Sequence, residues 1–188
     1  MSALPMVVLC CRVALGAVFA VSVAGKVRDR AAFTEFGASL VRMRLAGPRT
    51  AAAVAGATVL AEAAVVVAMC LPGPSWPGSA LALALLAVLT GGIVRTVRRG
   101  LAEPCRCFGA ARRPLGRVHV VRNAVLGAVA LAGGVAGLLD AGPPAPGALP
   151  PVVGVLVGVV AGLTLAAVLV RFEELVELFG PLPAPGRR

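Results

Sequence analysis

The stretch that decides the fold is TAAAVAGATVLAEAAVVVAMCL, residues 50–71. It is long and apolar enough to cross a bilayer as a helix, because a hydrocarbon core of about 30 Å takes about 20 residues at ~1.5 Å each. Its only charged side chain is Glu62. A charge inside the membrane must be paired or hydrated, so this residue also marks a candidate site.

Stretches of the same length and character flank it on both sides, at about 5–25, 77–97, 119–139 and 150–170. The whole chain is 59% hydrophobic and 14% charged with a mean hydropathy of +0.96, which is too apolar for a soluble domain. We therefore predict an all-α polytopic membrane protein with five spans. The first five residues carry no charged side chain, so the first span is expected to be retained rather than cleaved as a signal.

The net charge of +10 does not indicate nucleic-acid binding. The chain has no tyrosine and one tryptophan, and no soluble stretch is long enough for a nucleic-acid module. Arginines that collect in the cytoplasmic loops of a membrane protein explain the charge. The excess of arginine over lysine, with much Ala, Gly, Val and Pro, hints at a bacterial source.

The basic residues are segregated between loops. The loops after the second and fourth spans hold no lysine or arginine. The loop after the first span holds Lys26, Arg28, Arg30, Arg42, Arg44 and Arg49. The loop after the third span holds Arg98, Arg99, Arg106, Arg112, Arg113 and Arg117. The positive-inside rule then predicts a multi-pass protein of the bacterial cell membrane with its N-terminus outside. The loop after span three and the C-terminus are expected in the cytoplasm.

Arg12 is the predicted partner of Glu62. Measured from the outer ends of their spans, Arg12 lies about 10 Å deep and Glu62 about 14 Å deep at ~1.5 Å per residue. Adjacent antiparallel helices would therefore bring the two charges together. Such a pair either fixes the register of the helices or takes part in proton or substrate handling.

Two further patterns concern packing. Gly154, Gly158 and Gly162 are spaced for close helix contact, either within the chain or in a homo-oligomer. Residues 31–45 place apolar side chains at helical spacing and predict a short helix on the inner membrane surface. Residues 171–179 are expected to extend span five by an amphipathic turn or two.

Cys105 and Cys107 are the candidate reactive residues. They lie one residue apart among arginines, which favour the thiolate. The pair suits disulfide exchange or Cu(I) binding, or both residues are ordinary loop cysteines. Zinc fits less well because only His119 is available as a nitrogen ligand. The other cysteines, Cys10, Cys11 and Cys70, are expected to be buried and unbridged.

The chain resembles the MauE/DoxX-type membrane proteins over about residues 4–140. Glu62 matches the intramembrane acidic position of that group, and the opening signature is similar at Arg12, Gly16, Phe19, Ser22, Gly25 and Lys26. The MauE branch is indicated by Cys105-x-Cys107-Phe108-Gly109, followed by Arg122-Asn123.

This resemblance implies a DoxX-like four-helix bundle over residues 1–140, followed by a fifth transmembrane helix and short cytoplasmic tail in residues 141–188. It also implies a redox-accessory role with a thioredoxin-like partner or client protein, in methylamine utilisation for the namesake of the family. The activity would be at most thiol–disulfide exchange through Cys105 and Cys107, and no cofactor is expected. A Cu(I) or small-solute transporter and a structural subunit of a membrane complex are the alternatives. Maturation of an exported client would need the thiols outside, whereas the charge pattern places them inside.

Overall fold

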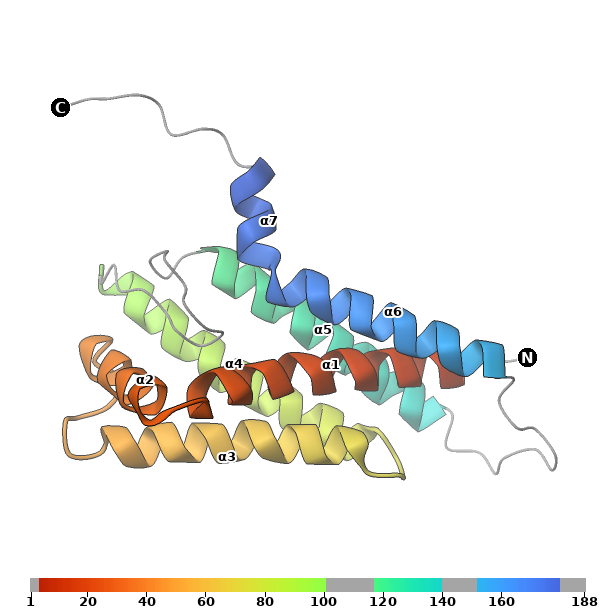
Figure 1. The fold of residues 1–188 in the computed structure, drawn as a ribbon, viewed down its shortest axis with the longest axis horizontal. Coiled ribbons are helices and arrows are strands. Elements are labelled where there is room, and N and C mark those ends of the chain that lie inside the picture. The colour runs from red at the N-terminus through yellow and green to blue at the C-terminus, as the bar shows by residue number, and fades with distance from the viewer. Residues whose placement is uncertain (1–3, 101–116, 140–151, 180–188) are drawn as a thin grey trace.

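The computed structural model describes residues 4–100, 117–139 and 152–179, and these segments are entirely helical apart from turns. The helices are α1 (Leu4–Val27), α2 (Arg30–Arg42), α3 (Ala51–Cys70), α4 (Trp76–Arg98), α5 (Arg117–Leu139), α6 (Val152–Val170) and α7 (Phe172–Phe179). Figure 1 shows their course from the N-terminus to the C-terminus.

Five of these helices, α1, α3, α4, α5 and α6, have the length and apolar composition needed to cross a membrane. They coincide with the five predicted spans within two residues at each end. The chain is thus an all-α, polytopic membrane protein, as the hydropathy pattern predicts. The predicted domain boundary at residues 140 and 141 lies outside the described residues, so that division stays a prediction.

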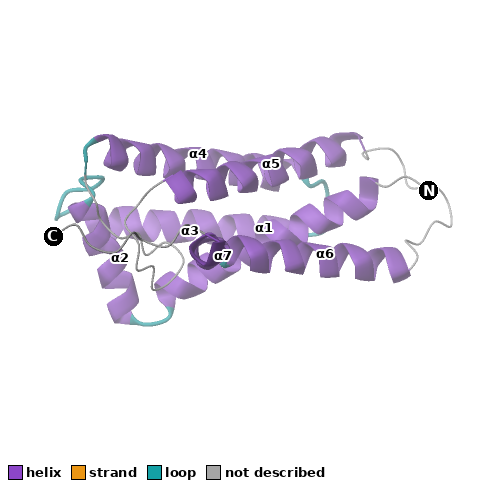
Figure 2. Ribbon diagram, turned by 90° about the horizontal axis from the view of Figure 1, so that it is seen from above, coloured by secondary structure: helices purple, strands orange, loops and turns teal. Residues whose placement is uncertain are grey.

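Helix α1 is the central element of the bundle. It packs against α3, α5 and α6, while α4 packs on α5 and on α3 (Figures 1 and 2). The core therefore forms around α1, where Leu15, Val18 and Phe19 are almost fully buried against residues of the neighbouring helices such as Val65 and Leu126.

Of the short helices, α2 packs against α3 and α1 at one end of the bundle, and α7 contacts α5 and α6 (Figure 1). The Asp29 side chain caps α2 by accepting a hydrogen bond from Ala32 N at 2.6 Å. Phe36 and Leu40 of α2 are buried in a cluster with Ala55 of α3. The sequence thus predicts the helix correctly. Helix α7 is not a continuation of α6, because it turns away from the α6 axis at Arg171 (Figure 1).

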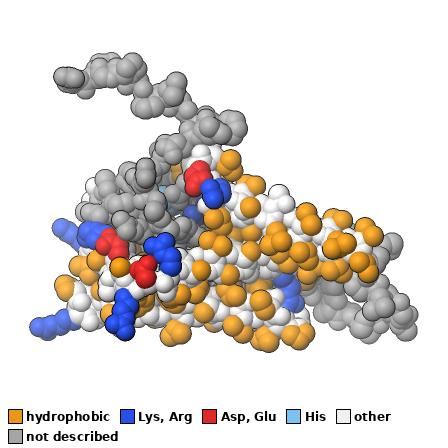
Figure 3. Space-filling model, in the orientation of Figure 1, with side chains coloured by type: hydrophobic (Ala, Val, Ile, Leu, Met, Phe, Trp, Pro, Cys, Tyr) orange, Lys and Arg blue, Asp and Glu red, His pale blue; other side chains and the backbone are white. Residues whose placement is uncertain are grey.

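The charged side chains are distributed unevenly over the described surface. Arginines gather at the end of the bundle that carries α2, whereas apolar side chains cover the flank formed by α1, α3 and α6 (Figure 3). We call the first region the basic end. Helix α1 ends and α3 begins at this end. Helix α4 also ends there, at Arg98, and α5 begins there, at Arg117, so both helices that flank the segment with Cys105 and Cys107 meet the basic end.

Candidate functional site

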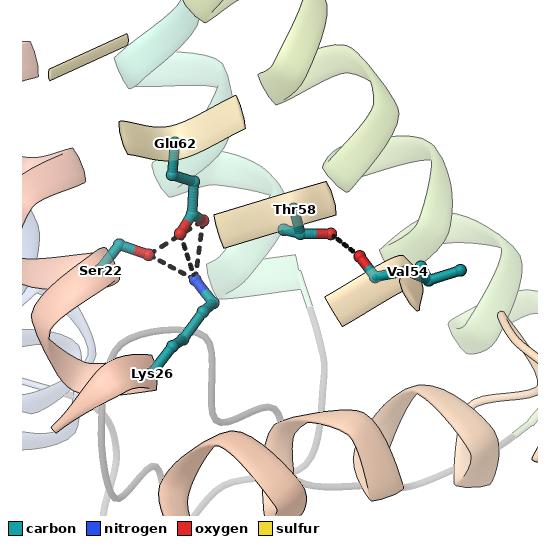
Figure 4. Close-up of polar contacts among 5 residues, drawn as sticks. All are labelled: Ser22, Lys26, Val54, Thr58 and Glu62. Atoms are coloured by element: carbon teal, nitrogen blue, oxygen red, sulfur yellow. Dashed lines mark hydrogen bonds and ion pairs between the residues drawn. The ribbon is translucent and has the colours of Figure 1, made fainter. Parts of the chain in front are cut away.

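A buried cluster of three polar side chains joins α1 to α3 (Figure 4). Lys26 Nζ donates to the two carboxylate oxygens of Glu62 at 2.7 Å and 2.8 Å. Ser22 lies one turn before Lys26 on α1. Its hydroxyl accepts from Lys26 Nζ at 2.6 Å and donates to Glu62 Oε1 at 3.1 Å. The spacing of four residues explains this arrangement, because it places Ser22 and Lys26 on one face of the helix.

The cluster is enclosed by protein rather than by solvent. Lys26 and Glu62 are each 1% exposed, and Ser22 is fully buried. Lys26 Nζ also lies 5.1 Å from the centre of the Phe36 ring, so α2 contributes a cation–π contact to the same group. Thr58, one turn before Glu62, does not join the cluster and donates to its own helix at Val54 O (2.9 Å; Figure 4).

The energetics of this cluster follow from its burial. Two buried charges lose their hydration, and their mutual attraction offsets that loss only with close geometry and additional hydrogen bonds. Here the two short contacts and the Ser22 hydroxyl supply both. Loss of either partner would leave a buried charge uncompensated, at a cost of about 3–5 kcal/mol. The contact between α1 and α3 is therefore favourable only while both partners are present.

The predicted Arg12–Glu62 pair is wrong, and Lys26 takes the place of Arg12. The expectation placed the outer ends of the first and second spans at the same depth. In the structure α1 is displaced along α3, so that Gly16 lies opposite Met69 and Ser22 lies opposite Glu62. Arg12 is therefore about 15 Å from the level of Glu62 at ~1.5 Å per residue. Lys26, counted among the loop cations from the sequence, belongs to the last turn of α1.

Arg12 instead binds the backbone of the last turn of α3 and of the turn that follows it. Its Nε donates to Met69 O at 3.0 Å and its Nη1 to Gly73 O at 2.9 Å, and its Nη2 donates to Leu71 O. The last carbonyls of a helix have no partners within the helix, so the guanidinium satisfies acceptors that the apolar surroundings would leave unpaired. The cation also lies at the negative end of the α3 dipole.

A second group of buried polar residues lies at the head of α5. His119 and Arg122 are buried there, as is Asn123, whose Nδ2 donates to Thr90 Oγ1 of α4 at 3.1 Å. Arg122 and Asn123 belong to the motif on which the family resemblance rests. The structure thus places them at the head of α5, where Asn123 contacts α4.

Cys105, Cys107, Phe108 and Gly109 lie outside the described residues, so their predicted roles stay predictions. Within the described part of the chain the remaining cysteines are unbridged, as expected. Cys11 is buried as expected, whereas Cys10 is only partly buried and Cys70 is exposed at the end of α3, contrary to expectation. The described residues contain no group of three His, Cys, Asp or Glu side chains able to hold a metal ion.

The glycines of α6 pack against α1. A Cβ on Gly158 would lie 3.1 Å from Leu9 Cδ2, and one on Gly162 would lie 2.7 Å from Cys10 O. Both glycines are buried. They therefore serve close packing within the chain, which was one of the two alternatives. A homo-oligomer through Gly154, Gly158 and Gly162 stays an untested prediction.

Sequence reasoning missed the Lys26–Glu62 pair and the part that Phe36 plays in it. The signal for the pair was present, because Ser22 and Lys26 occur four residues apart on one helix face. Nothing in the sequence indicates the longitudinal offset of α1 against α3. The Phe36 contact depends on the fold of α2 over the end of the bundle.

Comparison with known proteins supports one family. A protein-family model described as methylamine utilisation protein MauE matches residues 4–136, which is more than half of the chain and includes Cys105 and Cys107. No match was found among curated proteins or among solved structures.

Proposed function

The chain belongs to the MauE family, and we propose on that premise that it is a membrane redox-accessory protein that exchanges disulfides with a partner protein through Cys105 and Cys107. The observation that carries the proposal is the family match, since its range contains the Cys-x-Cys-Phe-Gly stretch. A pair of closely spaced thiols next to arginines is suited to this chemistry.

The proposed reaction requires no cofactor. One thiolate of the pair attacks a disulfide of the partner, forms a mixed disulfide and releases one thiolate of the partner. The second thiolate of the pair then attacks the mixed disulfide. The partner leaves with two thiols, and Cys105 and Cys107 are left as a disulfide. The reverse sequence would oxidise the partner, so the same pair serves either direction.

The described helices support the proposal because the two helices that flank the segment with Cys105 and Cys107 are joined to each other. Helix α4 ends and α5 begins at the basic end of the bundle, and the Asn123–Thr90 hydrogen bond joins the two helices. Farther along the bundle, the Lys26–Glu62 pair joins the last turn of α1 to the middle of α3. Cys105 and Cys107 therefore belong to a segment whose two flanking helices are held by polar contacts within the membrane domain.

Trapping of a mixed disulfide tests the function. Cys107→Ser and Cys105→Ser variants, each with one thiol of the pair left, are expected to retain a partner in a covalent complex that a reductant releases. Cys70→Ser is the matched control, because it removes an exposed thiol elsewhere and should leave trapping unchanged. Permanently reduced thiols, with full function in a Cys105→Ser/Cys107→Ser variant, would contradict the proposal. Stoichiometric copper that is lost in this double variant would favour the Cu(I) alternative.

We further propose that the chain resides in the bacterial cell membrane with the basic end in the cytoplasm. The clustering of arginines at that end supports this orientation. A membrane-impermeant thiol reagent applied to intact cells tests it in a cysteine-free background. Pro74→Cys, between α3 and α4, should react, whereas Arg49→Cys, at the basic end, should react only after permeabilisation. The opposite pattern would place Cys105 and Cys107 outside.

A further inference from the structure

An open groove runs along the outer flank of the bundle between α3 and α6, with α1 as its floor. These two helices pack on α1 from different sides, as Figure 1 shows. The cavity has a volume of about 800 Å³ and is lined almost entirely by apolar side chains. That volume lies within the range of ligand sites in proteins, which is about 300–1,000 Å³.

Small residues on α1 create the depth of the groove. Gly16 and Ala20 lie four residues apart on one face of α1, and Ala17 lies beside them. Val66 of α3 and Leu163 of α6 stand on the two sides. The floor therefore follows the helix axis, which is the shape that an extended hydrocarbon chain requires.

Among the described residues that line this groove, Arg12 is the only one with a charged side chain. Each of its three guanidinium nitrogens donates to one backbone carbonyl at the end of α3. Because a guanidinium carries five N–H groups, one further N–H remains on each of Nη1 and Nη2. Within the described part of the chain no carboxylate lies within ion-pair distance of Arg12, so its positive charge faces the groove with only carbonyl dipoles around it.

We propose that the groove is a binding site for an anionic phospholipid. One acyl chain lies along Gly16, Ala17 and Ala20, and the phosphate accepts hydrogen bonds from the remaining N–H groups of Arg12. Charge-assisted hydrogen bonds from arginine to phosphate are among the strong ones, and the apolar lining strengthens them further. A zwitterionic lipid fits the apolar part equally well but offers no net negative charge to the cation. The site is therefore expected to bind lipids with a negatively charged headgroup more tightly than zwitterionic lipids.

The position of Arg12 gives this site a structural consequence. The same guanidinium holds the backbone between α3 and α4, so a phosphate bound to it would add an anion to the contacts that keep Met69 O, Leu71 O and Gly73 O in place. A bound lipid is thus expected to stabilise the α3–α4 turn as well as fill the groove. This property is independent of Cys105 and Cys107.

Native mass spectrometry of the purified full chain tests the proposal. The probes are phosphatidylglycerol and phosphatidylcholine with identical acyl chains, added in increasing amounts to the delipidated protein in detergent. We expect wild type to retain phosphatidylglycerol at least about tenfold more tightly than phosphatidylcholine, because the choline cation of phosphatidylcholine cancels the net negative charge that attracts Arg12. Equal retention of the two lipids by wild type would overturn the proposal.

Two variants separate the headgroup contact from the acyl contact. Arg12→Gln removes the charge and should abolish the preference for phosphatidylglycerol, whereas Arg49→Gln, at the basic end, should not. Ala20→Leu places a larger side chain at an exposed position on the floor of the groove, and it should weaken the binding of both lipids. Ala128→Leu, at an exposed position on α5, is its control. Circular dichroism and gel filtration check that each variant is folded.

Three outcomes of this series would contradict the site. The first is an unchanged preference in folded Arg12→Gln, and the second is unchanged retention in Ala20→Leu. The third is a loss of dimers rather than of lipid in Ala20→Leu, which would make the groove a contact between copies of the chain. If Arg12→Gln fails to fold, the Ala20→Leu and Ala128→Leu comparison still decides whether lipid occupies the groove.

Discussion

Lys26 Nζ lies 2.7 Å and 2.8 Å from the two carboxylate oxygens of Glu62, and both residues are 1% exposed. The contact joins the last turn of α1 to the middle of α3. Because the charges are shielded from water, neither residue can lose its partner without a large penalty. The pair is thus a strong determinant of how the two helices align.

The first prediction concerns single substitutions in this pair. Glu62→Gln and Lys26→Met should each lower the free energy of unfolding by about 3–5 kcal/mol, because each leaves one uncompensated buried charge. Equilibrium unfolding of the purified protein in detergent measures the change. Glu35→Gln is the control, since its 2.8 Å contact with Arg42 is partly exposed and should contribute no more than about 1 kcal/mol.

A double variant separates structure from chemistry. Lys26→Met with Glu62→Leu removes both charges together, and most of the lost stability should return. If this variant folds and still traps its partner, the pair acts only in alignment. If it folds and no longer traps its partner, the pair contributes to disulfide exchange. Wild-type stability in both single variants would show that the contact does not exist in the folded protein.

The second prediction concerns the α1–α6 contact. Gly162→Ala would place a Cβ 2.7 Å from Cys10 O, which is backbone and cannot move aside easily. Forced overpacking of this kind costs about 1–3 kcal/mol, so the melting temperature should fall. Gly91→Ala is the matched control on α4, because its Cβ would meet nothing within 4 Å. It should raise stability slightly, since alanine is favoured over glycine in a helix by about 1 kcal/mol. Equal effects at the two positions would contradict close α1–α6 packing.

The sequence predicts the spans well and their alignment poorly, for a physical reason. Five apolar stretches of bilayer length leave little choice of secondary structure, since a chain in lipid must satisfy its backbone hydrogen bonds within each helix. The displacement of one helix along another is decided by local packing, such as Gly16 against Met69. Depths counted from helix ends carry no information on this displacement, so they pair Glu62 with Arg12 instead of Lys26.

The residues of the candidate site could be predicted from the sequence in part, but most of their contacts could not. Glu62 stands out as a carboxylate in an apolar span, and Ser22 and Lys26 share a helix face by their spacing. Phe36 enters the cluster only because α2 folds over the end of the bundle. Likewise, Asn123 meets Thr90 because α4 and α5 are neighbours at that level. Contacts of this kind depend on tertiary structure and leave no periodic signal in one sequence.

The third prediction concerns the acid sensitivity of α2. The hydrogen bond from Ala32 N, followed by that from Arg28, holds the pKa of Asp29 below its ordinary value. A carboxyl whose pKa is lower in the folded state stabilises the fold above its unfolded pKa, and this contribution is lost as the pH falls through the folded pKa. The first turn of α2 should therefore lose amide-exchange protection in acid, after correction for intrinsic exchange rates. Asp29→Asn keeps a capping side chain without a titrating group. If its protection is as acid-sensitive as that of wild type, Asp29 is not the cause.

The fourth prediction concerns the hydrogen bond from Asn123 Nδ2 to Thr90 Oγ1, at 3.1 Å between α5 and α4. A double-mutant cycle of Asn123→Ala and Thr90→Ala should give a coupling energy of about 0.6 kcal/mol, as is typical of side-chain hydrogen bonds between membrane helices. Thr164→Ala on α6 is the control, because its hydroxyl donates only to its own helix at Val160 O. It should show no coupling to Asn123→Ala.

The same cycle carries a functional readout. Asn123 and Thr90 belong to the two helices that flank the segment with Cys105 and Cys107. Loss of their hydrogen bond should therefore slow mixed-disulfide formation more than the small change in stability would suggest, since effective attack requires a fixed orientation of the reacting groups. The rate of trapping in the Cys107→Ser background, measured with and without Asn123→Ala at equal folded fraction, tests this. Equal rates would mean that the α4–α5 contact supports the fold without influencing the thiols.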